Sequence, residues 1–297
     1  MINYSIEYLY FNSNQFQLEA KLYRVKEKDR PIILMAHGFA AEMDYGLYPF
    51  AHEFAQLNFN VFMFNYRGFG NSEGKVKHLV DHRKHIEDIQ NAIKFIGYLK
   101  NINTNKIILW GSSYGGGHVL TIAAKNKKIY AVIAQVPFVD GIATILNLPV
   151  KNLFLGTFYG ILDIIYNLFN KTYYIPVVST PDKFAAMNTY DSYDGYIKLV
   201  PENKRNHNYC AARISFTLPF YRPIKIVHKI QCPVLLIAAE KDSLIPLKAI
   251  EKTISRIKHL YYKILPCGHF DIYNGYYFNE NIKIQKEFLN KIDSLFV

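Results

Sequence analysis

The sequence predicts an α/β fold in which a doubly wound, mostly parallel sheet carries an inserted helical cap. Short apolar runs alternate with segments of helical periodicity up to about residue 140, and the alternation resumes near residue 226. Strands and helices in alternation imply a parallel sheet with helices on both faces. The stretch between is aromatic-rich and lacks this alternation. We therefore expect one α/β core, residues 1–140 and 226–297, interrupted by a cap at residues 141–225.

The elements follow from the spacing of apolar residues. Two strands, residues 6–11 and 16–23, flank Asn12-Ser13-Asn14 and predict a hairpin at an antiparallel edge of the sheet. Later strands are expected where apolar runs are short and continuous, and helices where apolar residues recur with helical spacing. In chain order we predict strands at 32–36, 60–64, 107–110, 131–136, 233–238 and 260–265, and helices at 48–57, 81–99, 118–124, 247–257 and 281–296.

Composition indicates a globular protein rather than a disordered or nucleic-acid-binding one. Half of the 297 residues are hydrophobic and a fifth are charged, so the chain can bury a substantial core. The 35 Lys and Arg exceed the 24 Asp and Glu and give a net charge of +11. Because the basic residues are scattered singly, we expect a solvated basic surface, with some attraction to acidic substrates or lipid head groups, rather than a nucleic-acid interface.

Three features favour a cytoplasmic location. The cysteines are few, odd in number and far apart, which suggests reduced thiols; they are Cys210, Cys232 and Cys267. The first residues lack the basic start and apolar core of a signal peptide. The longest apolar region, residues 142–169, is interrupted by a proline and two charged residues, so we expect no membrane span.

The stretch Gly111-Ser112-Ser113-Tyr114-Gly115 fits the pattern G-x-S-x-G with Ser113 at its centre. An apolar strand precedes it and a helix follows, which is the context in which this pattern presents a nucleophilic serine on a sharp, strained turn. The alternative interpretation is an ordinary tight strand-to-helix turn. On the first interpretation the Ser113 hydroxyl stands above the sheet edge, and the Tyr114 N–H points at a developing oxyanion.

A serine nucleophile needs a base and an acid that orients the base. Asp242 follows the predicted strand 233–238, and His269 follows the last predicted strand, so both should reach the sheet edge that carries Ser113. Other roles stay open: Asp242 could cap the next helix, and His269 could be a surface-loop histidine. Asp140 is a rival acid, and Glu240 is a weaker one because alternation along the strand directs it elsewhere.

A second oxyanion donor is expected from the loop after strand 32–36. His37-Gly38-Phe39 follows that strand at once, and the N–H of Phe39 is well placed beside that of Tyr114. We interpret the His37 side chain as structural.

The remaining motifs favour neither a metal ion nor an organic cofactor. The glycines at 68–74 miss the dinucleotide-binding spacing, and residues 111–117 lack the lysine of a phosphate loop. His78, His82 and His85 lie close in sequence, but neighbouring basic residues would repel a cation, so we interpret them as solvated.

The predicted cap contains residues 145–169, which are apolar around much of a helix circumference. Such a helix must be buried or lie against something apolar. It could pack on its own domain, make peripheral membrane contact, or roof an acyl or aromatic pocket. In the last case the pocket would be lined by Phe154, Phe158, Tyr159 and Tyr166.

These motifs together resemble the α/β-hydrolase-fold serine hydrolases, over nearly the whole core. The resemblance rests on His37-Gly38-Phe39, residues 65–72, residues 111–115, Asp242 and Gly268-His269. Residues 110–118 and 134–141 are similar to the dienelactone-hydrolase-like and acyl-esterase-like branch, whose members include esterases, peptidases and polyketide thiohydrolases or transferases. The chain has Asn65 where the family usually has Asp, a departure that does not touch the triad.

The resemblance implies a cofactor-independent serine hydrolase that cleaves small-molecule carboxylic esters or thioesters through an acyl-enzyme. In chain order, Ser113, Asp242 and His269 would be nucleophile, acid and base. One alternative keeps this site in an acyltransferase or small-peptide peptidase. The other is a non-catalytic protein that binds a lipid or a partner.

Overall fold

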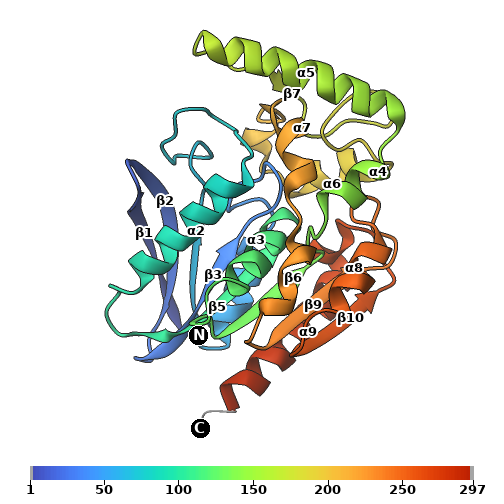
Figure 1. Ribbon diagram of the computed structural model, residues 1–297. Helices are drawn as coiled ribbons and strands as arrows, with labels where there is room; N and C mark the ends of the chain where they lie inside the picture. The colour runs from blue at the N-terminus through green and yellow to red at the C-terminus, as the bar shows by residue number, and fades with distance from the viewer. Residues whose placement is uncertain (1–2, 295–297) are drawn as a thin grey trace.

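The computed structural model describes residues 3–294, which form an eight-stranded sheet with helices on both faces (Figure 1). The strand order is β1-β2-β4-β3-β5-β6-β9-β10. The predicted hairpin, β1 (Tyr4–Ser13) and β2 (Phe16–Val25), forms the antiparallel edge, and every other pair except β2–β4 is parallel. The predicted mostly parallel α/β fold is therefore confirmed.

The other core elements lie close to their predicted positions. The strands are β3 (Arg30–Ala36), β4 (Asn60–Phe64), β5 (Ile102–Ser112), β6 (Ala131–Gln135), β9 (Val234–Ala239) and β10 (Leu260–Leu265). The helices are α1 (Tyr48–Gln56), α2 (His82–Ile96), α3 (Tyr114–Ala123), α8 (Leu247–Ile254) and α9 (Gly275–Ser294). The last helix begins earlier than predicted, and the predicted positions 295 and 296 lie outside the described residues.

The sheet separates two hydrophobic cores. Along β3, Ile32 and Leu34 contribute to one core while Ile33 and Met35 contribute to the other, because successive side chains of a strand point to opposite faces. The first core packs against α2, α3 and α8, and the second against α1 and α9. Burial on both faces explains why these strands are continuous apolar runs in the sequence.

Residues 141–225 form helices and a small second sheet outside the eight-stranded sheet, and part of this segment packs into the first hydrophobic core. The helices are α4 (Gly141–Leu146), α5 (Val150–Leu168), α6 (Ser192–Leu199) and α7 (Ile214–Thr217). Strands β7 (Tyr174–Ile175) and β8 (Cys210–Ala211) pair with each other, which the sequence pattern did not predict. Short 3₁₀ turns lie at Glu202–Lys204, Leu218–Phe220 and Pro223–Lys225.

Helix α5 is mostly exposed, so it does not bury its apolar residues by packing on its own domain, which was one of the three alternatives for this helix. Only Gly156, Gly160 and Asp163 are buried, because these small or paired residues face α7, where Asp163 binds Arg213 at 2.7 Å. Figure 1 shows α5 at the end of the molecule opposite the end of α9. None of the described helices, α5 included, combines the length and the apolar content needed to span a bilayer.

Candidate active site

Ser113 lies at the sharp turn between β5 and α3, with φ 54° and ψ −119°. A positive φ is strained for a residue with a Cβ, and the surrounding structure must hold it. The Ser113 N–H donates to the Gln135 carbonyl at 3.0 Å, and the Ser113 carbonyl accepts from the Phe138 N–H at 2.8 Å. These bonds fix the serine hydroxyl at the carboxyl end of the central strands.

The glycines beside Ser113 are required by close backbone contacts. A Cβ on Gly111 would lie 2.3 Å from the Gly115 carbonyl oxygen, and one on Gly115 would lie 2.3 Å from the Ala36 carbonyl oxygen. Gly38 lets the loop after β3 pass close to the serine, since a Cβ there would lie 3.3 Å from Ser113 Cβ. The glycine pattern therefore brings this loop and the serine turn together.

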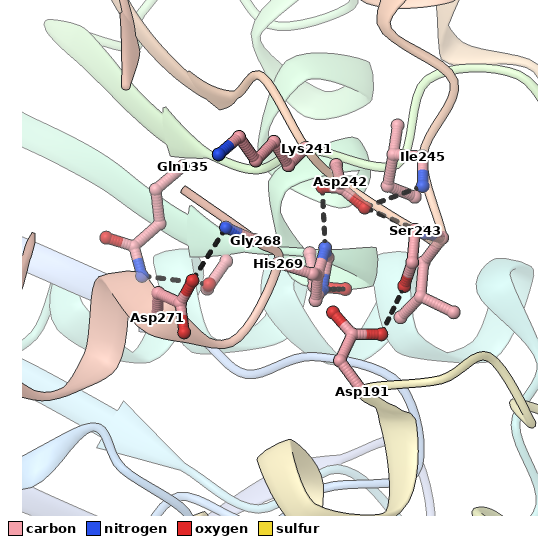
Figure 2. A network of polar contacts seen from close by, with 12 residues as sticks. Gln135, Asp191, Lys241, Asp242, Ser243, Ile245, Gly268, His269 and Asp271 are labelled. Atoms are coloured by element: carbon pink, nitrogen blue, oxygen red, sulfur yellow. Dashed lines mark hydrogen bonds and ion pairs between the residues drawn. The ribbon is translucent and has the colours of Figure 1, made fainter. Parts of the chain in front are cut away.

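The structure brings Ser113, His269 and Asp242 into one chain of hydrogen bonds. His269 Nε2 lies 3.1 Å from Ser113 Oγ. His269 Nδ1 lies 2.7 Å from Asp242 Oδ2, a contact that Figure 2 shows. The side chains of His269 and Asp242 are 2% and 4% exposed. A buried carboxylate that accepts the Nδ1–H orients the imidazole and leaves Nε2 available to accept the serine proton.

In the structure Asp242 is not a helix cap, and neither Asp140 nor Glu240 takes its place beside His269. The second oxygen of Asp242 accepts the N–H groups of Leu244 and Ile245 at 2.9 and 2.8 Å, so it orders the turn before α8 rather than capping that helix. Asp140 caps α4 and forms a bidentate pair with Arg222. The rival carboxylate of Glu240 is exposed.

Two free backbone donors lie beside the serine. Tyr114 begins α3, where the first N–H groups have no acceptor within the helix, and Phe39 follows Gly38. Neither the Phe39 nor the Tyr114 N–H donates to a protein acceptor within residues 3–294. Both residues line the cavity that contains Ser113, and their rings meet edge to face at 5.7 Å. Free N–H groups at a helix N-terminus favour an anion.

His37 has a structural environment, as the sequence interpretation held. It is buried, its ring packs against Tyr66 at 4.2 Å, and burial lowers its pKa to about 3.

Sequence reasoning missed Asp191 and Ser243. Ser243 Oγ donates to Asp191 Oδ1 at 2.5 Å, and Thr189 Oγ1 donates to the same oxygen at 2.9 Å. Figure 2 shows Asp191 reaching Ser243, on the loop that carries Asp242. Asp191 belongs to the 141–225 segment, where no periodic pattern marked it, so no sequence signal could have found it.

A buried polar layer lies beneath the serine and was also missed. Ser112 Oγ hydrogen-bonds with Tyr273 and accepts from Gln135 Nε2 at 2.9 Å. Gln285 of α9 donates to Gln135 Oε1 at 2.9 Å and accepts from the Trp110 indole N–H at 2.7 Å. Because every member has a partner, this layer ties α9 rigidly to β5 and β6.

A cavity of about 790 Å³ opens onto Ser113 between the sheet edge and residues 144–220. Its walls are mainly apolar, and the described residues that line it include no Asp, Glu, Lys, Arg or His. A volume of this size accommodates a large ligand. The chain's excess of positive charge therefore does not extend to the walls around Ser113.

The aromatic side chains predicted to line a pocket lie elsewhere. Phe154, Phe158 and Tyr166 are 75%, 55% and 41% exposed, and Tyr159 packs against Tyr173. The cavity is lined instead by another face of the same helix, with Asn152, Leu153, Gly156 and Thr157. The sequence did not identify the inward face because both faces are apolar.

The histidines near α2 are not solvated, which corrects the sequence interpretation. His85 is buried and stacks on Tyr66 at 4.1 Å, and burial lowers its pKa to about 3. His82 stacks on Tyr221 at 4.4 Å. His78 is buried apart from these two, beside Tyr209 at 4.4 Å, and burial lowers its pKa to about 4.

Comparisons with known proteins agree with this architecture. Residues 27–269 match the family described as serine aminopeptidase, S33. The quorum-quenching protein AidA of Acinetobacter baumannii is 35% identical over 285 residues, which are 95% of this chain and 93% of AidA. The thiohydrolase aneE of Aspergillus aculeatus is 34% identical over 125 residues, 42% of this chain and 39% of aneE. The crystal structure of the α/β hydrolase GrgF from Penicillium sp. sh18 shares the fold, with a TM-score of 0.81 at 20% identity over 97% of this chain and 98% of GrgF.

Proposed function

We propose that this chain, which belongs to the serine aminopeptidase S33 family of α/β-hydrolases, hydrolyses esters or thioesters of large, uncharged acyl groups through an acyl-enzyme on Ser113. One observation carries the proposal. The hydroxyl that lies 3.1 Å from His269 Nε2 opens onto an apolar cavity of about 790 Å³. Residues 141–225 act in this proposal as a cap that supplies much of the cavity wall.

In the acylation step His269 Nε2 takes the proton of Ser113, and Ser113 Oγ attacks the carbonyl carbon of the substrate. The carbonyl oxygen gains negative charge and accepts the N–H groups of Phe39 and Tyr114. Asp242 stabilises the imidazolium through its bond to Nδ1. When the tetrahedral intermediate collapses, the bond to the leaving alcohol or thiol breaks, and His269 gives the proton to that group.

In the deacylation step water replaces the serine as the nucleophile. His269 takes a proton from water, and the resulting hydroxyl attacks the acyl carbon in the same oxyanion site. Collapse then releases the carboxylic acid, and the proton returns to Ser113 Oγ. One water is consumed per ester or thioester bond cleaved, and no oxidant, reductant or other co-substrate is required.

The cavity favours an uncharged acyl group over a peptide with a free amino terminus. A buried ammonium group requires a carboxylate partner. The cavity lining described above contains no acidic side chain, and the nearby carboxylate of Asp191 is already bound to Ser243. We therefore propose ester or thioester cleavage rather than aminopeptidase activity, although the family is described as serine aminopeptidase.

The relatives' names support a narrower candidate role. AidA is named as a quorum-quenching protein and aneE as a thiohydrolase. The similarity to AidA extends over nearly the full length of both chains. We therefore include degradation of an acylated bacterial signalling molecule as a second candidate function.

The proposal is tested by comparing the wild-type chain with Ser113→Ala. The wild type should hydrolyse p-nitrophenyl esters, be labelled by a fluorophosphonate probe at Ser113 and release free acid rather than a transfer product when an alcohol acceptor is added. Ser113→Ala should lose both labelling and turnover. Turnover that survives in Ser113→Ala would refute the mechanism, and an unlabelled wild type would favour a binding protein.

We also propose that the exposed face of α5 contacts the surface of an anionic membrane. Phe154 and Leu168 are each 75% exposed on this helix, whose one acidic residue, Asp163, is buried against Arg213. Together with the net charge of +11, an outward apolar face without acids suits binding at a lipid interface.

A flotation assay with anionic and zwitterionic vesicles tests this contact. Wild type should float with anionic vesicles, and the Phe154→Ser variant should float less. Equal flotation of the wild type and Phe154→Ser would contradict the membrane contact. A stable dimer in gel filtration, formed through the exposed face of α5, would contradict it as well.

We also propose a cytoplasmic location, which the free state of all three cysteines supports.

A further inference from the structure

A second cluster of chemistry-bearing side chains lies outside the proposed catalytic machinery. Glu42, His78 and His207 come from the loops after β3 and β4 and from the 141–225 segment. One possible ligand atom from each lies within 4.8 Å of the others. Residues from three distant parts of the chain therefore converge on one small volume.

The cluster has unsatisfied hydrogen-bonding capacity. Among partners offered by residues 3–294, Glu42 Oε1, His78 Nδ1 and His207 Nδ1 have none, although all three atoms are buried. Glu42 and His78 are 1% and 5% exposed. An orphaned buried polar atom is costly, and three such atoms in one place indicate a missing common partner.

The spacing fits a shared ion better than a hydrogen bond. His207 Nδ1 and Glu42 Oε1 are 3.6 Å apart, which is too long for a hydrogen bond. Two ligands held at about 2.0–2.1 Å by a tetrahedral zinc ion lie about 3.4 Å from each other. All three ligand atoms lie within 4.8 Å of one another, so no pair has to close by more than about 1.4 Å to reach zinc-ligand spacing.

Carboxylate oxygens beside the cluster are available to a cation. Lys204 Nζ binds Glu42 Oε2 at 2.6 Å and Asp44 Oδ2 at 2.7 Å, so one lysine is shared between two carboxylates. Glu42 Oε1 and Asp44 Oδ1 stay buried with no hydrogen-bond partner among the described residues. Lys77, whose charge adds to burial in lowering the pKa of His78, is another cation near the cluster, so a bound metal ion has to compete with it. The backbone of His78 has φ 50°, in the left-handed region that the surrounding structure must hold.

We propose that Glu42, His78 and His207 bind one zinc ion. Two imidazoles and a carboxylate form a ligand set that zinc accepts, with a fourth position for water or for Asp44. The ion would join the loop that carries Phe39 to the 141–225 segment, a junction also made by the Tyr196 hydroxyl, which donates to the Ala40 carbonyl at 2.8 Å. Its role is to stabilise the junction; no reacting atom is assigned to it.

The experiment measures zinc binding and thermal unfolding of the full chain after dialysis against a chelator. We expect one equivalent of zinc in the wild type and in the matched control His259→Ala, which removes an exposed histidine elsewhere. Both should gain about 5 °C in Tm when free zinc exceeds Kd about 100-fold. His207→Ala should lose at least about tenfold in affinity and should show no zinc-dependent gain in Tm.

Glu42→Gln provides a second variant, because it keeps the side-chain shape while it removes the anionic ligand. Should Glu42→Gln be poorly folded, His207→Ala, whose residue is only partly buried, still decides the case. The proposal is overturned if the wild type binds no zinc at micromolar concentrations, or if His207→Ala binds it as tightly as His259→Ala does. Cobalt substitution adds a check, since thiolate charge-transfer absorption would assign the metal to a cysteine instead.

Discussion

Gly156→Phe should shorten the acyl chain that the cavity accepts. Gly156 lines the cavity from α5, and the atom nearest to a Cβ there is Ser215 Oγ at 3.3 Å, the end of a side chain that can rotate away. The backbone can therefore accept a side chain, but a ring attached to it must enter the cavity. The substitution removes binding volume without touching Ser113, His269 or the oxyanion donors.

The size of the effect follows from hydrophobic transfer. Each methylene that enters an apolar cavity contributes about 0.8 kcal/mol, or a factor of about 4 in kcat/KM. A phenylalanine ring displaces about three or four methylenes, so kcat/KM for a dodecanoate ester should fall about 60- to 250-fold. The acetate ester does not reach Gly156 and should change by less than about twofold.

The assay compares p-nitrophenyl esters of graded chain length for wild type, Gly156→Phe and the control Phe158→Ala. Phe158 lies on the same helix but is 55% exposed and does not line the cavity. Its replacement should leave the chain-length profile unchanged. An equal loss for acetate and dodecanoate esters in Gly156→Phe would refute the reasoning, and so would a shifted profile in Phe158→Ala.

Three further perturbations test the site and the fold. Asp242→Asn should keep the hydrogen bonds to the Leu244 and Ile245 N–H groups. It should lower kcat about 10⁴-fold, because the amide favours the wrong His269 tautomer. A loss under about tenfold in steady-state kinetics would argue against Asp242 as the acid that orients His269. Arg222→Ala leaves the partly buried Asp140 without its bidentate partner and should cost about 1–3 kcal/mol in urea unfolding, whereas an unchanged midpoint would show that the pair contributes nothing. Acid should destabilise the fold through buried histidines whose folded-state pKa lies below the unfolded value. The unfolded chain then binds protons that the native chain does not, so this stability is present above about pH 6.5 and is lost as pH falls towards the folded pKa. At about pH 5.5 each such histidine should cost about 1.4 kcal/mol, and urea unfolding that is flat between about pH 7.5 and 5.5 would contradict this. Burial lowers the pKa in each case, to about 3 for His37 and His85 and well below its ordinary value for His118.

Local pattern explains why much of the core could be predicted. Continuous apolar runs mark strands buried on both faces, and the parallel order places the residue that follows each strand at the same edge. Ser113 directly follows β5, whereas Asp242 and His269 lie a few residues beyond β9 and β10, so three positions distant in sequence could be expected to meet. Their separations of 3.1 and 2.7 Å required the tertiary structure.

Residues 141–225 had no comparable pattern. The apolar residues of α5 cover both of its faces, so periodicity could not show that Gly156 faces the cavity while Phe154 faces solvent. The contact of Asp191 with Ser243 depends on how this segment folds back over the sheet.

The sequence by itself determined the mostly parallel sheet, the strained serine turn and the chain order of nucleophile, acid and base, because each depends on neighbouring residues or on where a strand ends. Only the tertiary structure decided the shape and neutrality of the cavity, the burial of the histidines near α2 and the convergence of Glu42, His78 and His207. Those features arise where loops that are distant in sequence approach one another. The free energy of that approach is the sum of many contacts between distant residues, and a local sequence pattern does not contain that information.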